Sequence, residues 1–268
     1  MPASEPRFAL NHIVAPERMP EAFFALAGEL GIGAVEIRND IAGNAILDRT
    51  PAARIAALAR TAGVRILSIN ALQRFDDWRG ERPREAVELA DYAAACGAEA
   101  LVLVPTNDGS RPADLRPALA ALRPILAARG LAGLIEPLGF ESSSLRLKSE
   151  AAEAVAATGG EGVFRLVHDS FHHHLAGEAT IFPALTGLVH ISGVEEAGLA
   201  PGEMRDADRV LVGPRDRLGN LAQIQSLLAA GYRGFLSFEP FAAEVQGRAD
   251  KAALIRESMD FVRAGIAA

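Results

Sequence analysis

Residues 164–177 read FRLVHDSFHHHLAG, and the fold prediction starts from these fourteen positions. A short apolar run with β character ends abruptly there in one carboxylate, Asp169, and a cluster of four imidazoles. Such a change is typical of the carboxyl end of a parallel strand, where the chain passes into a catalytic loop. We therefore expect Asp169 to lie at the centre of a functional site.

Three other short apolar runs also end in a carboxylate or an imidazole: Glu136 follows residues 131–135, His190 follows residues 185–189, and Glu239 follows residues 235–238. In a closed barrel the carboxyl ends of all parallel strands meet at one mouth. Because side chains alternate along a strand, His190 should share an inward face with Leu188. A lone carboxylate after a strand is usually a solvated residue or a helix N-cap, but four polar groups at equivalent positions favour a shared site. We expect them to converge as a Glu/Asp/His/Glu set.

Short apolar runs alternate with Ala- and Leu-rich helical patterns along the whole chain. The predicted strands are residues 8–14, 34–38, 64–69, 100–104, 131–136, the run that ends at Asp169, 187–191 and 234–239. The predicted helices are residues 17–30, 51–63 with Thr50 as N-cap, 83–96, 112–129, 150–157, 221–230 and 248–264, with the poorly patterned residues 178–185 in place of the sixth. This order predicts an α/β fold, a (β/α)₈ TIM barrel formed by residues 1–268 as a single domain. An open doubly wound sheet should carry a glycine-rich phosphate loop after its first strand, and residues 11–16, NHIVAP, are not one.

The composition argues against several classes of protein. A chain of 268 residues that is 50% apolar can bury one large core. Its net charge of -7 argues against nucleic-acid binding, which needs a basic face. No apolar run approaches the length of a membrane span. The single cysteine, Cys96, can form no intrachain disulfide and residues 1–7 contain no apolar leader segment, so we expect a cytoplasmic protein.

The Glu/Asp/His/Glu set is typical of a site for one divalent cation. Three carboxylates and one imidazole offer mostly oxygen ligands, which suits Mn²⁺ best, with Mg²⁺, Co²⁺ and Zn²⁺ as alternatives. A closed structural zinc site would use cysteine and histidine ligands instead. Such a centre needs no organic cofactor.

The histidine tract after Asp169 supplies further candidates for the site. We expect His172 and His174 to face the pocket and His173 to face elsewhere, while a surface metal-binding run is the alternative for the tract. His168 has the opposite parity to Asp169 and should pack against a helix.

Four polar residues near the ends of the first three predicted strands are candidate substrate contacts. Glu36 and Arg38 form either a strand-end ion pair or a pair that orients substrate hydroxyl groups at the barrel mouth. Asn11 and Asn70 are neutral hydrogen-bonding groups that suit either a structural role or a substrate contact.

These residues resemble a known family. The motifs that carry the resemblance are Glu36-Ile37-Arg38, Asn70-Ala71-Leu72, Asp169-Ser170-Phe171-His172 with His174, His190-Ile191, Asp208-Arg209-Val210 and Glu239 after the last strand. They look like the xylose isomerase-like TIM barrels, and within that superfamily the likeness is greatest to the 2-keto-myo-inositol isomerases, also called inosose isomerases. The resemblance implies metal binding by the Glu/Asp/His/Glu set and acid-base chemistry by Glu136 and Glu239. The sequence departs from the family at residues 211–216, LVGPRD, where a Gly-x-Gly turn is usual.

The predicted reaction follows from the ligand set. An α-hydroxy ketone that chelates the cation has a more acidic C–H, because the metal stabilises the developing enediolate. One of Glu136 and Glu239 would remove the proton and the other return it, which gives isomerisation or epimerisation. His172 and Arg209 would hold and polarise the substrate oxygens, with Arg209 presented by the long, charged loop at residues 192–219.

We therefore expect a metal-dependent isomerase that interconverts 2-keto-myo-inositol and a neighbouring keto-inositol. A ketose 3-epimerase or a hydroxypyruvate-type isomerase on the same scaffold is the alternative. A metal-dependent phosphodiesterase would need more histidine ligands and a basic face, and a silent sugar-binding barrel would not need both glutamates. The expected partner is a small polyol or keto-sugar, and the sequence leaves assembly into a homo-oligomer open.

Overall fold

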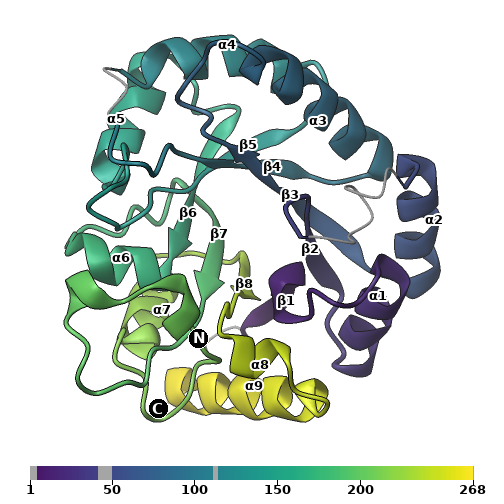
Figure 1. The fold of residues 1–268 in the computed structure, drawn as a ribbon, viewed down its shortest axis with the longest axis vertical. Coiled ribbons are helices and arrows are strands. Elements are labelled where there is room, and N and C mark those ends of the chain that lie inside the picture. The colour runs from purple at the N-terminus through teal and green to yellow at the C-terminus, as the bar shows by residue number, and fades with distance from the viewer. Residues whose placement is uncertain (1–4, 42–49, 111–113, 268) are drawn as a thin grey trace.

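Eight parallel strands close into a barrel at the centre of the molecule (Figure 1). The computed structural model describes residues 5–41, 50–110 and 114–267. The strands are β1 (Arg7–Asn11), β2 (Ala34–Arg38), β3 (Arg65–Gln73), β4 (Ala100–Val104), β5 (Ala132–Ile135), β6 (Phe164–Asp169), β7 (Thr186–Ile191) and β8 (Phe235–Phe238). The barrel closes because β1 pairs in parallel with both β2 and β8. The predicted (β/α)₈ TIM barrel is confirmed.

Helices form an outer ring around the strands (Figure 1). They are α1 (Pro20–Glu29), α2 (Ala52–Ala62), α3 (Arg82–Cys96), α4 (Arg116–Ala127), α5 (Lys148–Ala157), α6 (Ser170–Ala176), α7 (Asn220–Ala229), α8 (Ala243–Gln246) and α9 (Lys251–Ala267). Three short 3₁₀ turns lie in the loops, at His12–Val14, Pro201–Glu203 and Asp206–Asp208. Within the described ranges, every helix is too short or too polar to cross a membrane.

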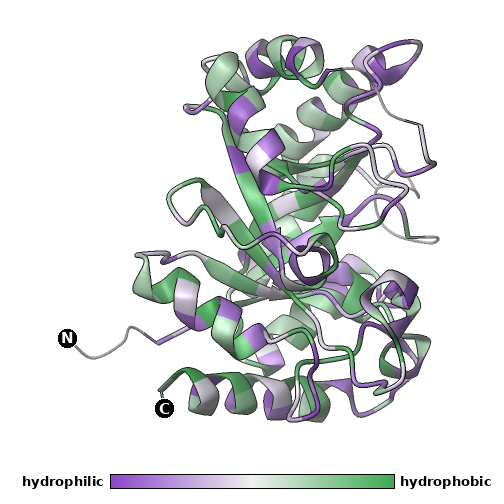
Figure 2. Cartoon of the chain, turned by 90° about the vertical axis from the view of Figure 1, so that its left-hand side faces the viewer, coloured by the Kyte–Doolittle hydropathy of each residue, from purple (hydrophilic) through white to green (hydrophobic). Residues whose placement is uncertain are grey.

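The period-two pattern of the strands places an apolar core inside the barrel. Leu134, Val167 and Leu188 pack there with apolar residues, mostly alanines, from β1 to β4. Each of the three lies two positions before a polar residue of the predicted set, so the same inward face carries the polar group one layer nearer the mouth. A larger core fills the space between the sheet and the helices. Figure 2 shows mostly apolar strands in the interior and helices that alternate apolar and polar residues along their length.

Several element boundaries differ from the predictions. β1 ends at Asn11, and the next three residues form a 3₁₀ turn in which the Asn11 side chain accepts a hydrogen bond from the backbone of Ile13. The N-cap of α2 is Pro51, which has an extended ψ of 134°, and not Thr50. Of the predicted helix at 112–129, residues 112 and 113 lie outside the described part of the chain, and α4 begins at Arg116.

The histidine tract forms a helix, which the sequence did not predict. The Asp169 carboxylate accepts hydrogen bonds from the backbone N–H groups of Phe171 (2.7 Å) and His172 (3.1 Å) and so caps α6 at its N-terminus. α6 is therefore the sixth helix of the barrel, whereas the sequence analysis placed the poorly patterned residues 178–185 there. A helix of seven residues is too short to show a clear amphipathic period, which explains the wrong prediction.

Candidate metal centre and active site

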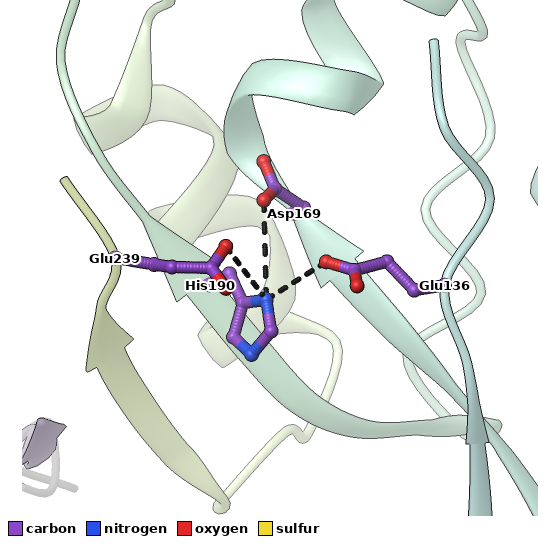
Figure 3. Close-up of side chains that lie close together, drawn as sticks. All are labelled: Glu136, Asp169, His190 and Glu239. Carbon is purple, nitrogen blue, oxygen red and sulfur yellow. Dashed lines mark hydrogen bonds and ion pairs between the residues drawn. The ribbon is translucent and has the colours of Figure 1, made fainter. Parts of the chain in front are cut away.

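The four polar strand-end residues converge at the barrel mouth (Figure 3). One ligand atom from each of Glu136, Asp169, His190 and Glu239 lies within 4.8 Å of the others, and all four residues are buried. They come from the ends of β5 to β8, and Asp169 pairs in register with His190. Asp169 and His190 are the last inward positions of their strands, while the two glutamates follow directly after theirs.

His190 lies at the centre of the cluster, and its two ring nitrogens face different carboxylates. Nδ1 lies 2.9 Å from Glu136 Oε1, 3.2 Å from Glu239 Oε2 and 3.9 Å from Asp169 Oδ2. Nε2 faces Glu36 Oε1 at 3.0 Å on the opposite side of the ring. The ring orientation is therefore set from both sides, which is how a histidine is held when one nitrogen serves as a metal ligand.

Glu36 supports His190 from inside the barrel. It is fully buried and accepts hydrogen bonds of 2.6 Å from the hydroxyls of both Ser68 and Ser237. Burial alone would raise its pKa, but the charge and hydrogen bond of His190 and the two hydroxyls lower the pKa to about 2. Glu36 is thus ionised. It is absent from the lining of a cavity that lies over the cluster and is described below. Glu36 was predicted to contact the substrate, but the structure places it behind His190. It lies there because β2 continues for two residues beyond Glu36, to Arg38.

Arg209 bridges two members of the cluster. Its Nη2 donates to Asp169 Oδ2 (2.7 Å) and to Glu239 Oε2 (2.9 Å), and its side chain is 1% exposed. The guanidinium lies 4.9 Å from the ring centroid of Phe171 and 4.7 Å from that of Phe241. Arg209 was predicted to contact the substrate from the long loop. It also fixes two carboxylates of the cluster, those of Asp169 and Glu239.

Glu239 receives three further side-chain donors on its other oxygen. Oε1 accepts from Arg38 Nη1 (3.0 Å), Asn11 Nδ2 (3.0 Å) and Asn70 Nδ2 (3.4 Å). Asn11 was predicted to have either a structural role or a substrate contact. It is fully buried and contacts Glu239. Arg38 also forms a paired contact with Asp40, at 2.7 and 2.8 Å. Glu239 is held rigidly, which is what an acid-base carboxylate requires.

The cluster has an excess of buried negative charge. Burial alone would lower the pKa of His190, but Glu239, Glu36 and Glu136 together raise it well above its ordinary value. Burial raises the pKa of Glu136. For Glu239 burial acts in the same sense, yet the charges of His190 and Arg209 outweigh it and lower the pKa. Three convergent carboxylates and one oriented imidazole fit a divalent cation with mixed oxygen and nitrogen ligands.

A cavity of about 400 Å³, here called the inner chamber, lies over the cluster. Glu136 and Glu239 line it, whereas Asp169 and His190 are absent from its described lining. Two buried polar atoms in this lining have no hydrogen-bond partner among the described residues: Asn70 Oδ1 and His172 Nδ1. Buried polar groups rarely stay unpaired, so these atoms are expected to bind a polar ligand.

The other predicted histidines lie away from the inner chamber. His174 is partly exposed on α6 and does not belong to the described lining, so the structure does not bring it to the site as predicted. His168 Nε2 lies 2.8 Å from Gln223 Oε1 on α7, and His173 Nδ1 lies 2.6 Å from Lys148 Nζ on α5. His168 thus packs against a helix, as its parity predicted, and His173 faces away from the inner chamber.

Two residues of the inner chamber were not predicted from the sequence. Arg74 and Phe241 both line it, at the ends of β3 and β8. Phe241 lies two positions after Glu239, so the strand alternation extended past the predicted strand end would have suggested it. Arg74 adopts a left-handed backbone conformation with a φ of 54°, and no sequence pattern signals that for arginine.

The fold and the cluster together define a barrel protein with a candidate metal centre at the carboxyl end of its sheet. The chain belongs to the xylose isomerase-like TIM barrel family, whose model matches residues 24–265. No curated protein matches the chain.

Solved structures of the same architecture support this assignment. A xylose isomerase domain-containing protein from Salmonella typhimurium LT2 is 32% identical, with a TM-score of 0.91 over 99% of both chains. The IOLI protein with a bound zinc atom is 20% identical, with a TM-score of 0.82 over 97% of this chain and 98% of its own. D-psicose 3-epimerase with D-tagatose, from Clostridium cellulolyticum H10, is 14% identical, with a TM-score of 0.72 over 97% and 99%. The last two similarities concern the fold.

Proposed function

We propose that the protein is a metal-dependent isomerase or epimerase of a polyhydroxy ketone, with a keto-inositol as the leading substrate. The observation that carries the proposal is the position of Glu136 and Glu239, which line the inner chamber beside two unpaired polar atoms. Membership of the xylose isomerase-like family supports the reaction class. The shared fold of the zinc-bound IOLI protein supports a divalent cation at this mouth.

Four residues would hold the cation: Glu136, Asp169, His190 and Glu239. We propose Mn²⁺, because three of the four ligands are carboxylates. When bound, such a cation acts as a Lewis acid that makes the carbon-bound proton next to a carbonyl group more acidic.

The two glutamates would move the proton. Figure 3 shows Glu136 and Glu239 approaching from opposite sides of His190, so their carboxylates would flank a substrate in the inner chamber. One carboxylate oxygen would take a proton from the carbon beside the carbonyl, and the other would return one. Return to the neighbouring carbon gives isomerisation, and return to the same carbon gives epimerisation.

Other residues of the inner chamber would orient the substrate. Asn70 Oδ1 and His172 Nδ1 would each pair with a hydroxyl group of a polyol, since both atoms are buried without a partner among the described residues. Arg38 and Arg209 hold opposite oxygens of Glu239 and so fix the plane of its carboxylate. Leu138 and Phe140 supply apolar wall beside these groups.

Proton exchange with solvent tests the proposal. Wild-type protein with Mn²⁺ in D₂O should introduce deuterium at the carbon next to the carbonyl of 2-keto-myo-inositol, because a proton held on a carboxylate exchanges with solvent. The product is analysed by NMR and mass spectrometry. Product that keeps all of the substrate's own hydrogen would instead indicate a hydride shift and would refute the acid-base role of the glutamates.

A panel of ketoses distinguishes the two leading substrates. The fold shared with D-psicose 3-epimerase makes ketose 3-epimerisation the second candidate. If deuterium is introduced into a free ketohexose but into no keto-inositol, the proposed proton-transfer chemistry stands. The function is then ketose 3-epimerisation.

Metal content tests the ligand set independently of turnover. Elemental analysis should find one divalent ion per wild-type chain and less in His190→Gln, which removes the nitrogen ligand while retaining a side chain of similar length. Stoichiometric metal in a protein with all four ligands changed to alanine would refute the assignment.

A further inference from the structure

A second cavity adjoins the inner chamber. It measures about 630 Å³ and is here called the outer chamber. Asn107, Phe140 and Asp206 line both cavities, so the two are adjacent and share a wall. Ligand sites generally measure about 300–1,000 Å³, and the inner chamber alone is sufficient for a single polyol ring. The outer chamber therefore provides room for a part of the substrate that lies beyond the reacting ring or chain end.

Two arginines line the outer chamber without a carboxylate partner in the described part of the chain. Arg146 donates from Nε (3.1 Å) and Nη2 (2.9 Å) to the carbonyl oxygen of Gly139. Arg205 donates from Nη1 to the carbonyl oxygens of Gly202 and Met204, each at 2.8 Å. Neutral carbonyl groups fix both side chains but do not cancel their charges. Nη1 of Arg146 and Nη2 of Arg205 keep N–H donors for a ligand.

The acidic residues of the outer chamber do not form ion pairs with these two arginines in the described structure. Asp206 lies 3.1 Å from Arg209 Nη1 and forms no ion pair with Arg146 or Arg205 in the described structure. Glu141 is exposed and forms no ion pair with Arg146 or Arg205 in the described structure. Elsewhere on this protein, which has a net charge of -7, arginines commonly pair with carboxylates. The outer chamber therefore presents two guanidinium groups that are fixed by carbonyl oxygens and have no carboxylate partner among the described residues.

The shared wall adds neutral donors to the same region. Asn107 Oδ1 accepts a hydrogen bond of 2.6 Å from the hydroxyl of Ser142, which leaves the Asn107 amide N–H groups for a ligand. Phe140 packs edge-on against His172, with ring centroids 5.1 Å apart, and so connects the outer chamber to a proposed substrate contact of the inner one.

We propose that the substrate carries an anionic group, a phosphate or a carboxylate, at the end remote from its ketone, and that Arg146 and Arg205 bind this group in the outer chamber. Guanidinium groups match the planar or tetrahedral oxygens of both anions and form charge-assisted hydrogen bonds with them. The inference rests on the proposed function for the position of the ketone, and it favours the second candidate, a ketose, because 2-keto-myo-inositol carries no anionic group. The charge of the outer chamber is independent of it.

Anion binding is measured first, without reference to turnover. Sulfate serves as the probe for a phosphate and acetate as the probe for a carboxylate, each titrated calorimetrically into the Mn²⁺-loaded protein. The double variant Arg146→Met/Arg205→Met should bind the preferred anion at least about tenfold more weakly than wild type. The control is Arg84→Met on the exposed face of α3, where Arg84 pairs with Glu81 and Glu88, and it should bind like wild type. Any anion held by the metal is common to all three proteins and cancels in the comparison.

Matched ketones then test the substrate class. D-Fructose, D-fructose 6-phosphate and D-fructuronate present the same ketose with no anionic group, a phosphate and a carboxylate. For wild type, kcat/KM should be at least about tenfold higher for one of the two anionic ketones than for fructose. In the double variant this preference should disappear while kcat/KM for fructose stays within about twofold.

The outcomes separate the two proposals. Equal anion affinity in wild type and the double variant would overturn the outer-chamber proposal and leave the proposed function standing. An equal loss of kcat/KM for all three ketones would also overturn it, because the arginines would then be structural. If no ketone, 2-keto-myo-inositol included, is turned over or exchanged by any protein, the proposed function fails, and the sulfate and acetate titrations still decide whether the outer chamber binds anions.

Discussion

Adjacent residues of β6 and α6 contribute to two polar clusters of opposite character. Asp169 faces inward and joins the mouth cluster, defined as Glu36, Glu136, Asp169, His190 and Glu239. His168 and His173 face outward and join the rear cluster, defined as Lys148, His168, His173, Glu178 and Gln223. The mouth cluster has more carboxylates than cationic groups, and the rear cluster has more basic groups than carboxylates.

The buried histidines of the two clusters respond in opposite directions. Burial lowers the pKa of His168 to about 3, and the nearby Lys148 acts in the same sense. His190 is buried as completely, yet the surrounding carboxylates raise its pKa well above the ordinary value. The sign of the shift is thus set by the neighbouring charges and not by burial alone. A site prepared for a cation is recognised by its surplus of carboxylates, which the rear cluster lacks.

The largest expected effect concerns the glutamates of the two clusters. Glu239→Gln keeps the size of the side chain and one oxygen ligand but removes the proton acceptor, so kcat should fall by about 10²- to 10⁴-fold. Glu178→Gln is the matched control, because Glu178 caps the backbone of Lys148 and Ser149 in the rear cluster. Its kcat should stay within a few-fold of wild type. Comparable losses in both variants would mean that the mouth cluster has no special role in turnover.

The second expected effect concerns the stability of the metal-free protein. Arg209→Ala removes the cationic partner of two buried carboxylates, Asp169 and Glu239, and should lower the free energy of unfolding by about 3–5 kcal/mol. Arg215→Ala, in the same loop, breaks only a pair with Glu195 at the surface and should cost less than about 1 kcal/mol. Urea unfolding in the presence of a chelator measures both. A cost below 1 kcal/mol for Arg209→Ala would show that the mouth cluster does not depend on this bridge.

The third expected effect concerns the orientation of His190. Glu36→Gln replaces the carboxylate that faces Nε2, and a partner of this kind typically contributes 10- to 100-fold to metal affinity. We expect Mn²⁺ binding, measured by calorimetric titration, to weaken by about that factor while the barrel remains folded by circular dichroism. Ser68→Ala removes only one hydrogen bond to Glu36 and should have a smaller effect. Unchanged Mn²⁺ affinity in Glu36→Gln would argue against any positioning role.

The smallest expected effect is a pH dependence from the rear cluster. Burial lowers the pKa of His173 to about 4 from the 6.5 of an unperturbed histidine, and Lys148 adds to the shift. Between these pH values the unfolded chain binds a proton that the folded chain does not, so stability is present above pH 6.5 and is lost as the pH falls toward 4. His173→Gln should reduce this dependence by up to about one proton, measured by urea unfolding from pH 7 to pH 4. An unchanged pH dependence in His173→Gln would contradict this assignment.

The sequence alone determined the elements that depend on local periodicity. The alternation of apolar runs with helical patterns predicted the barrel, and the period of two within each run predicted which polar residue of each strand end faces inward. The outward direction of His168 followed from the same parity. These features could be read directly because side-chain direction along a strand repeats every two residues, whatever the rest of the chain does.

Only the tertiary structure decided how deep each side chain lies in the mouth and what it touches there. Glu36 and Glu239 are both glutamates near the end of a strand, yet Glu36 pairs in register with Ser68 while Glu239 lies two residues beyond Ser237. The first therefore lies behind His190 and the second lines the inner chamber. The outer chamber likewise joins segments around Asn107, Phe140 and Arg205. Depth depends on the stagger between neighbouring strands and on how distant loops fold over the mouth, and both are set by contacts between segments far apart in the chain.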